Sequence, residues 1–91
     1  MSALSELKRM VKLRDEALLS LDRDQILRYY KRYSSREEYA WMANVESDVF
    51  WGAVHKARSA NINLPIEARL ESKRWLEAKG WQSWNEGELS Q

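Results

Sequence analysis

The chain has 91 residues with 15 Lys and Arg against 14 Asp and Glu, and it contains no cysteine. A chain this short has room for one small domain, and the missing thiols exclude disulfide bonds and thiolate zinc sites, so its stability must come from packing. The net charge near +1 is not the composition of a dedicated nucleic-acid-binding domain. We expect a single helical domain over residues 1–84 and a frayed tail over 85–91.

The beginning of the chain and its apolar runs also exclude some locations. The first ten residues, "MSALSELKRM", are charged and contain no apolar core of a signal peptide. The longest apolar run, "VFWGAV" at 49–54, is too short to span a bilayer. We therefore expect a soluble cytoplasmic protein with no membrane partner.

The scarcity of helix breakers predicts an all-α fold. The chain has only three glycines and one proline to interrupt a helix. Its charges are evenly interspersed, which is typical of solvated helix faces. Apolar spacing predicts a compact bundle of about four helices, at roughly 3–21, 23–33, 36–59 and 65–79.

The first predicted helix carries one apolar stripe that a charge interrupts. Residues at spacings of three, four and seven form it: Leu4, Leu7, Val11, Leu18 and Leu21. Arg14 lies on this stripe, either as a long stem that passes the core or as a charged position that sets the register of a helix pair. Pairing of the stripe with its own copy would give a symmetric homodimer.

Capping patterns predict where the next two helices begin. Asp22 opens "DRDQ", in which its carboxylate can accept a hydrogen bond from a free backbone N–H. Either Ser34 with Glu37 or Ser35 with Glu38 fits a capping box before the third helix. That third helix, 36–59, is apolar over most of its circumference, so we expect it at the centre of the bundle.

Two glycines mark places of close packing and chain reversal. Gly52 weakens the third helix and is tolerable if another backbone or a ring lies against it. Gly80 fits the left-handed position after the last helix, which would bring Trp81 onto Leu76 and fold the tryptophan-containing C-terminal segment back. The directions of Trp75 and Trp84 stay open, and these two are candidate partner-binding residues.

Catalytic and metal-binding patterns are scarce. His55 is the one histidine, and Asp48, seven residues earlier, is its candidate carboxylate partner. No metalloprotease, di-iron, phosphate-loop or dinucleotide pattern occurs. We therefore expect no catalytic residue, no metal site, no cofactor and no enzymatic activity.

The stretch "RYYKRYSSR" at 28–36 combines cations with tyrosines. Its four cations are Arg28, Lys31, Arg32 and Arg36, and no acid lies between Gln25 and Arg36. Phosphates could accept the cations while exposed bases stack on Tyr29 and its neighbours. Alternatively, the tyrosines point inward and the cations are solvated or paired with acids of neighbouring helices.

Three segments carry a resemblance to a known group: "REEYAWM", "FWGAVHKAR" and "LPIEARLESKRWLEAKGWQSW". Over residues 36–84 the chain resembles small helical accessory proteins of temperate bacteriophages, among them the lambdoid recombination accessory proteins that modify the host RecBCD nuclease. It is similar in style to inhibitors of host defence as well. This resemblance implies a protein that binds and modulates a host protein.

Two functions follow from the sequence. The first is a non-enzymatic, phage-type binding protein that modulates or inhibits a larger host protein or protein–nucleic-acid complex, through the four cations and the tail tryptophans. The alternative is a small nucleic-acid-binding module that uses Arg28, Tyr29, Lys31, Arg32 and Arg36.

Overall fold

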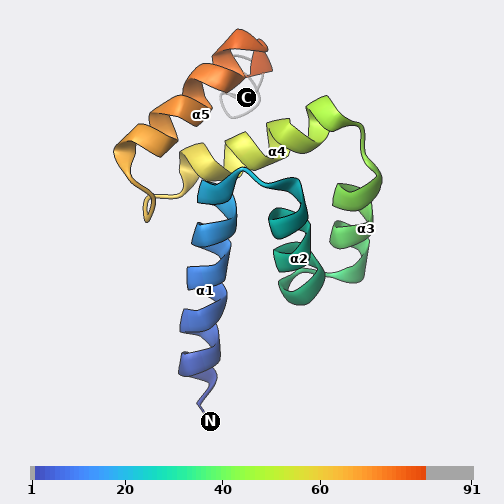
Figure 1. Cartoon of the computed structure of the whole chain (residues 1–91), viewed down its shortest axis with the longest axis vertical. Helices are drawn as coiled ribbons and strands as arrows, with labels where there is room; N and C mark the ends of the chain where they lie inside the picture. Colours follow the sequence, from blue (N-terminus) through green and yellow to red (C-terminus); the bar gives the residue numbers. More distant parts are fainter. Residues whose placement is uncertain (1, 82–91) are drawn as a thin grey trace, which may run out of the picture. The chain divides into compact units, whose positions relative to one another are not determined.

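A computed structural model describes residues 2–81, and it contains five α-helices and no strand within that range (Figure 1). They are α1 (Ala3–Ser20), α2 (Arg23–Tyr33), α3 (Arg36–Asn44), α4 (Ser47–Ala60) and α5 (Ile66–Ala78). The all-α prediction is confirmed, and the predicted number of four helices is wrong. The chain divides into two compact units, the first with α1–α3 and the second with α4 and α5. The single domain predicted over 1–84 stays a prediction.

The extra helix arises because the predicted helix over 36–59 is broken at its middle. Val45 adopts an extended conformation, and its N–H donates the last hydrogen bond of α3 to the Trp41 carbonyl at 2.9 Å. The Asn44 side chain donates to the Ala40 carbonyl at 2.7 Å. Asparagine can satisfy backbone groups in this way, which favours helix ends over helix interiors. The broad apolar face therefore belongs to two helices in different units.

The predicted helix starts agree with the observed N-caps. Ser2 accepts from the Ser5 N–H at 3.2 Å, and Asp22 accepts from the N–H groups of Asp24 and Gln25 at 2.9 and 3.2 Å. At the third start the choice is resolved in favour of Ser35, which accepts from the Glu38 N–H at 3.0 Å. The hydroxyl of Ser34 instead donates to the Tyr30 carbonyl at 2.7 Å and closes the end of α2.

In the first unit, α2 lies beside both α1 and α3 (Figure 1). The buried apolar side chains of this unit are Ala17, Leu18, Ile26 and Met42. Because α1 has 18 residues and α2 has 11, α2 is too short to cover α1 along its whole length. Accordingly Leu4 and Leu7, at the start of the predicted stripe, are 59% and 51% exposed. Arg14 is half-buried and pairs with Asp15 at 3.0 Å.

In the second unit, α4 and α5 form a helical hairpin around buried apolar side chains, namely Phe50, Val54, Leu64 and Leu76. Gly80 has the left-handed conformation predicted for it, with φ of 76°. After it, the Trp81 ring lies directly against Gly52 and has its edge toward Trp75, with ring centroids 5.6 Å apart. The Trp81 ring thus occupies the space that a Cβ at position 52 would need, which explains the glycine there. The predicted contact of Trp81 with Leu76 stays a prediction.

Part of the predicted C-terminal segment lies outside the described residues. This applies to Trp84 and to the tail over 85–91. The described contacts of this segment therefore end with Trp81.

The contact between Gly52 and Trp81 predicts that one substitution changes sign with its background. Gly52→Ala should destabilise the chain, because the added Cβ would collide with the Trp81 ring. In a Trp81→Ala background the same substitution should stabilise it by up to about 1 kcal/mol, the gain of alanine over glycine in a helix. Urea unfolding of the four chains measures both effects, and a stabilising Gly52→Ala in the unaltered chain would contradict this packing.

Candidate functional site

The four predicted cations lie from the middle of α2 to the start of α3, and all are exposed. Arg28, Lys31 and Arg32 are spaced by three and four residues, so they are neighbours on the surface of α2. Arg36 is the first residue of α3. We call these four residues the cation face.

The cation face forms no ion pair within residues 2–81. Acids follow immediately, since Glu37 and Glu38 occupy the first turn of α3, but neither pairs with a member of the face. Lys31 and Arg32 lie in the last turn of α2, where a positive charge interacts favourably with the negative end of the helix dipole. The Arg32 guanidinium also lies 5.3 Å from the centre of the Tyr33 ring. The charges of the face are thus available to a partner.

The tyrosines of the same stretch are half-buried and contact one another. Tyr29 contacts Tyr30 edge-on, with ring centroids 5.3 Å apart, and Tyr33 at 5.5 Å. The Tyr33 hydroxyl donates to Glu6 of α1 at 3.4 Å. Burial raises the pKa of Tyr29 and of Tyr30 above the ordinary value, so both hydroxyls are neutral. The ring contacts lie within α2, and the Tyr33 hydroxyl joins α2 to α1.

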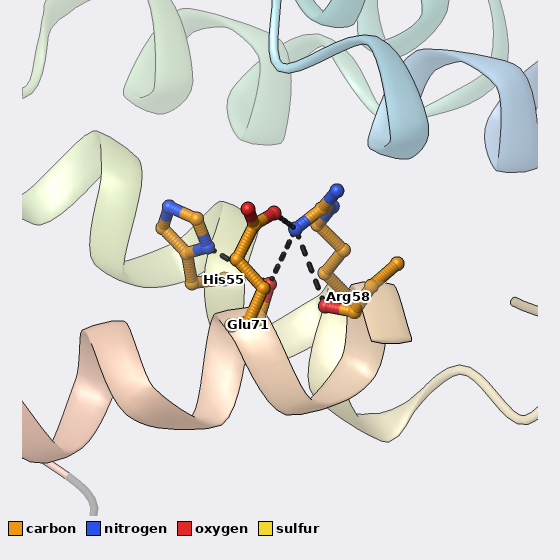
Figure 2. Close-up of polar contacts among 5 residues, drawn as sticks. His55, Arg58 and Glu71 are labelled. Atoms are coloured by element: carbon orange, nitrogen blue, oxygen red, sulfur yellow. Dashed lines mark hydrogen bonds and ion pairs between the residues drawn. The ribbon is translucent and has the colours of Figure 1, made fainter. Parts of the chain in front are cut away.

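The second unit contains a buried polar cluster between α4 and α5 (Figure 2). The Ser72 hydroxyl oxygen lies 2.8 Å from His55 Nδ1 and accepts a hydrogen bond from Arg58 Nη1 at 3.0 Å. The same nitrogen of Arg58 donates to Glu71 Oε1 at 2.7 Å and to the Ala68 carbonyl at 3.3 Å. His55, Arg58 and Ser72 are all buried. One hydroxyl therefore joins two polar side chains of α4 to α5.

The donors of this cluster fix the state of His55. Arg58 can only donate, so the Ser72 oxygen accepts from it and the Ser72 hydrogen remains to be placed. Within residues 2–81, the one acceptor for this hydrogen is His55 Nδ1, which favours a neutral His55 with its proton on Nε2. Burial lowers the pKa of His55, and the nearby Arg58 lowers it further, in agreement with a neutral ring.

The cluster has the atoms of a serine–histidine pair but not the access of a catalytic one. The exposed fraction of Ser72 is 0%, so no substrate can reach its oxygen in this conformation. A nucleophile needs its base and its substrate within reach at the same time. The arrangement is suited to holding α4 and α5 together.

The predicted partner of His55 is wrong. Asp48 lies 3.7 Å from Lys79 Nζ, whereas the ring nitrogen of His55 contacts Ser72. Asp48 is near the start of α4, and Lys79 follows the end of α5 and can reach it in the antiparallel hairpin.

Trp75 is half-buried within the second unit. Its ring stacks on His55 at a centroid distance of 4.5 Å, and Lys79 Nζ lies 5.4 Å from its centre. With the edge contact to Trp81, its ring has neighbours on more than one side. The other predicted tail residue, Trp84, lies outside the described range.

Sequence reasoning missed Ser72, Arg58 and Glu71. A pattern in α5 indicates Ser72, because it stands between Ala68 and Leu76 at spacings of four, on the side that faces α4. A serine on the apolar side of a helix must find a hydrogen-bond partner when it is buried. No local pattern indicates Arg58, since the partners described for it lie 10, 13 and 14 residues away.

Comparison of the chain with protein-family models, curated proteins and solved structures finds no match. Within residues 2–81, no group of three or more His, Cys, Asp or Glu side chains could hold a metal ion. None of the helices described is both long enough and apolar enough to cross a bilayer.

The lowered pKa of His55 predicts a loss of stability in mild acid. As the pH falls below about 6.5, the unfolded chain takes up a proton on His55 before the folded chain does, so the free energy of unfolding decreases until the folded pKa is reached. The slope is at most about 1.4 kcal/mol per pH unit. Urea unfolding between pH 7.5 and 5 should show this slope, and His55→Gln should remove it. An equal slope in both chains would contradict the neutral buried ring.

Proposed function

We propose that this chain is a non-enzymatic binding protein of the cytoplasm that modulates a larger protein or protein–nucleic-acid complex through the cation face. The observation that carries the proposal is the set of four exposed cations, Arg28, Lys31, Arg32 and Arg36, that form no ion pair within residues 2–81. They would bind an acidic surface of the partner. Charged groups at the rim of such an interface raise the association rate more than they slow dissociation.

The first unit is suited to presenting these charges in a fixed arrangement. The tyrosine rings pack on one another along α2, and the hydrogen bond from Tyr33 to Glu6 joins α2 to α1. The Ser35 cap and the Ser34 hydroxyl fix the short turn that brings Arg36 after α2. A partner therefore meets charges on ordered backbone, which lowers the entropy lost on binding.

A protein partner accounts for the surroundings of the face better than a nucleic acid does. Glu37 and Glu38 follow Arg36 directly and would repel a phosphate backbone, which carries only negative charge. A protein surface that is acidic overall can also carry positive side chains opposite these two carboxylates. The ring of Tyr29 already contacts the rings of Tyr30 and Tyr33, so it is less available for stacking on a nucleic-acid base. Nucleic acid remains the second candidate, favoured by the unpaired charge of the four cations.

The proposed partner belongs to a host cell. The resemblance to temperate-phage accessory proteins supports this part of the proposal, and the inhibition or redirection of a host enzyme complex is the expected outcome of binding. Trp75 and Trp84 stay proposed as further contact residues. The exposed leucines of α1 support a homodimer as the alternative mode of association.

Affinity purification from a host lysate, with and without nuclease, tests the proposal. The unaltered chain should recover one stoichiometric protein under both conditions. Substitution of the whole cation face by glutamine should reduce this recovery about tenfold, equivalent to about 1.4 kcal/mol. A matched control replaces four other exposed cations by glutamine: Lys8, Arg9, Lys73 and Arg74.

The control chain should recover the partner as the unaltered chain does. Complete loss of recovery after nuclease would transfer the function to nucleic-acid binding. Equal recovery by all three chains would show that the cation face is not the contact surface.

A further inference from the structure

Trp41 differs from the other tryptophans of the described chain. Its side chain is 50% exposed, and within residues 2–81 it makes no ring contact, no cation–ring contact and no hydrogen bond. Trp51, Trp75 and Trp81 all make ring contacts in the second unit. A large exposed aromatic ring is the side chain most enriched where proteins bind one another.

The helix sets the charge beside this ring. Glu37 and Glu38 precede Trp41 by four and three residues, so α3 brings both carboxylates to its side. Both are exposed, and neither forms an ion pair in the part of the chain that the structure describes. The Trp41 surface, as we call these three residues, is therefore an aromatic face with two negative charges one turn away.

An arginine side chain is the occupant that fits this combination. Its planar guanidinium stacks on an indole face and at the same time donates paired hydrogen bonds to a carboxylate. A lysine ammonium also attracts an indole ring but lacks the planar stacking and the fork of donors. An anionic partner is disfavoured by the two carboxylates.

We propose that the Trp41 surface, formed by Trp41, Glu37 and Glu38, binds an arginine side chain of the partner protein. This inference rests on the proposed function and sharpens it, because the partner would then carry an arginine beside the acidic patch that meets the cation face. Such mixed charge is found on protein surfaces and not on a nucleic-acid backbone. The Trp41 surface thus makes the first unit selective for a protein.

The test follows the indole N–H resonance of Trp41 by NMR in the full chain, assigned with the Trp41→Phe variant. The probe is a capped glycine peptide that carries arginine, and a lysine peptide of equal charge is its counterpart. The Trp41 resonance should shift and saturate at millimolar peptide, with about threefold tighter binding of arginine than of lysine. The Glu37→Gln/Glu38→Gln chain should bind about fivefold more weakly.

Matched controls separate this from loss of folding and from a general effect of charge. Glu67→Gln/Glu77→Gln also removes two exposed acids, one of them in the first turn of a helix, and should leave the titration unchanged. The backbone spectrum of each variant reports whether it remains folded.

Three results would overturn the inference: no shift at Trp41 in a folded chain, equal binding of arginine and lysine, or equal binding by the Glu37→Gln/Glu38→Gln chain. A shift that depends on protein concentration alone would make a second copy the occupant and would also overturn it. The cation-face variant should bind the arginine peptide normally. Failure of the affinity purification with an intact Trp41 titration would therefore reject the proposed function alone.

Discussion

The α4–α5 unit depends on one buried hydroxyl group, that of Ser72. Its oxygen accepts from Arg58 and lies 2.8 Å from His55 Nδ1, so two polar side chains of α4 that would be costly to bury are satisfied by a single hydroxyl of α5. Arg58 completes its contacts with Glu71 and the Ala68 carbonyl. The stacking of Trp75 on His55, the edge-on contact of Trp81 with Trp75 and the packing of Trp81 on Gly52 accompany this alignment of the two helices.

The polar groups discussed above differ in exposure between the two units. In the second unit, the histidine, the buried arginine and the serine are directed toward one another and are closed to solvent. In the first unit, the cation face and the Trp41 surface are exposed and form no ion pair within residues 2–81. The two proposed binding surfaces therefore lie in the first unit, while the buried polar groups of the second unit join α4 to α5. The proposed binding function rests on this difference in exposure.

Helix class and helix starts could be predicted from the sequence because they depend on neighbours within four residues. Asp22, Ser35 and Gly80 are examples, each with its partner in the adjacent turn. The break at Val45 was missed because the apolar pattern continues through it, and the side chain of Asn44 outweighs that pattern locally. The pairing of His55 with Ser72, 17 residues away, depends on how α5 returns along α4, which no local pattern fixes. For the candidate site, the sequence indicated the cations and left the direction of the tyrosines open.

The protonation state of His55 directly tests the hydrogen bonding of Ser72 with His55 and Arg58. Nitrogen-15 NMR of the folded chain at pH 7 distinguishes the two neutral tautomers and the imidazolium by their ring nitrogen shifts. Because the Ser72 oxygen accepts from Arg58 and its hydrogen has His55 Nδ1 as its one acceptor within residues 2–81, we predict a neutral ring with its proton on Nε2. A proton on Nδ1, or a charged ring at pH 7, would contradict this arrangement, because the Ser72 hydrogen would then have no acceptor within residues 2–81.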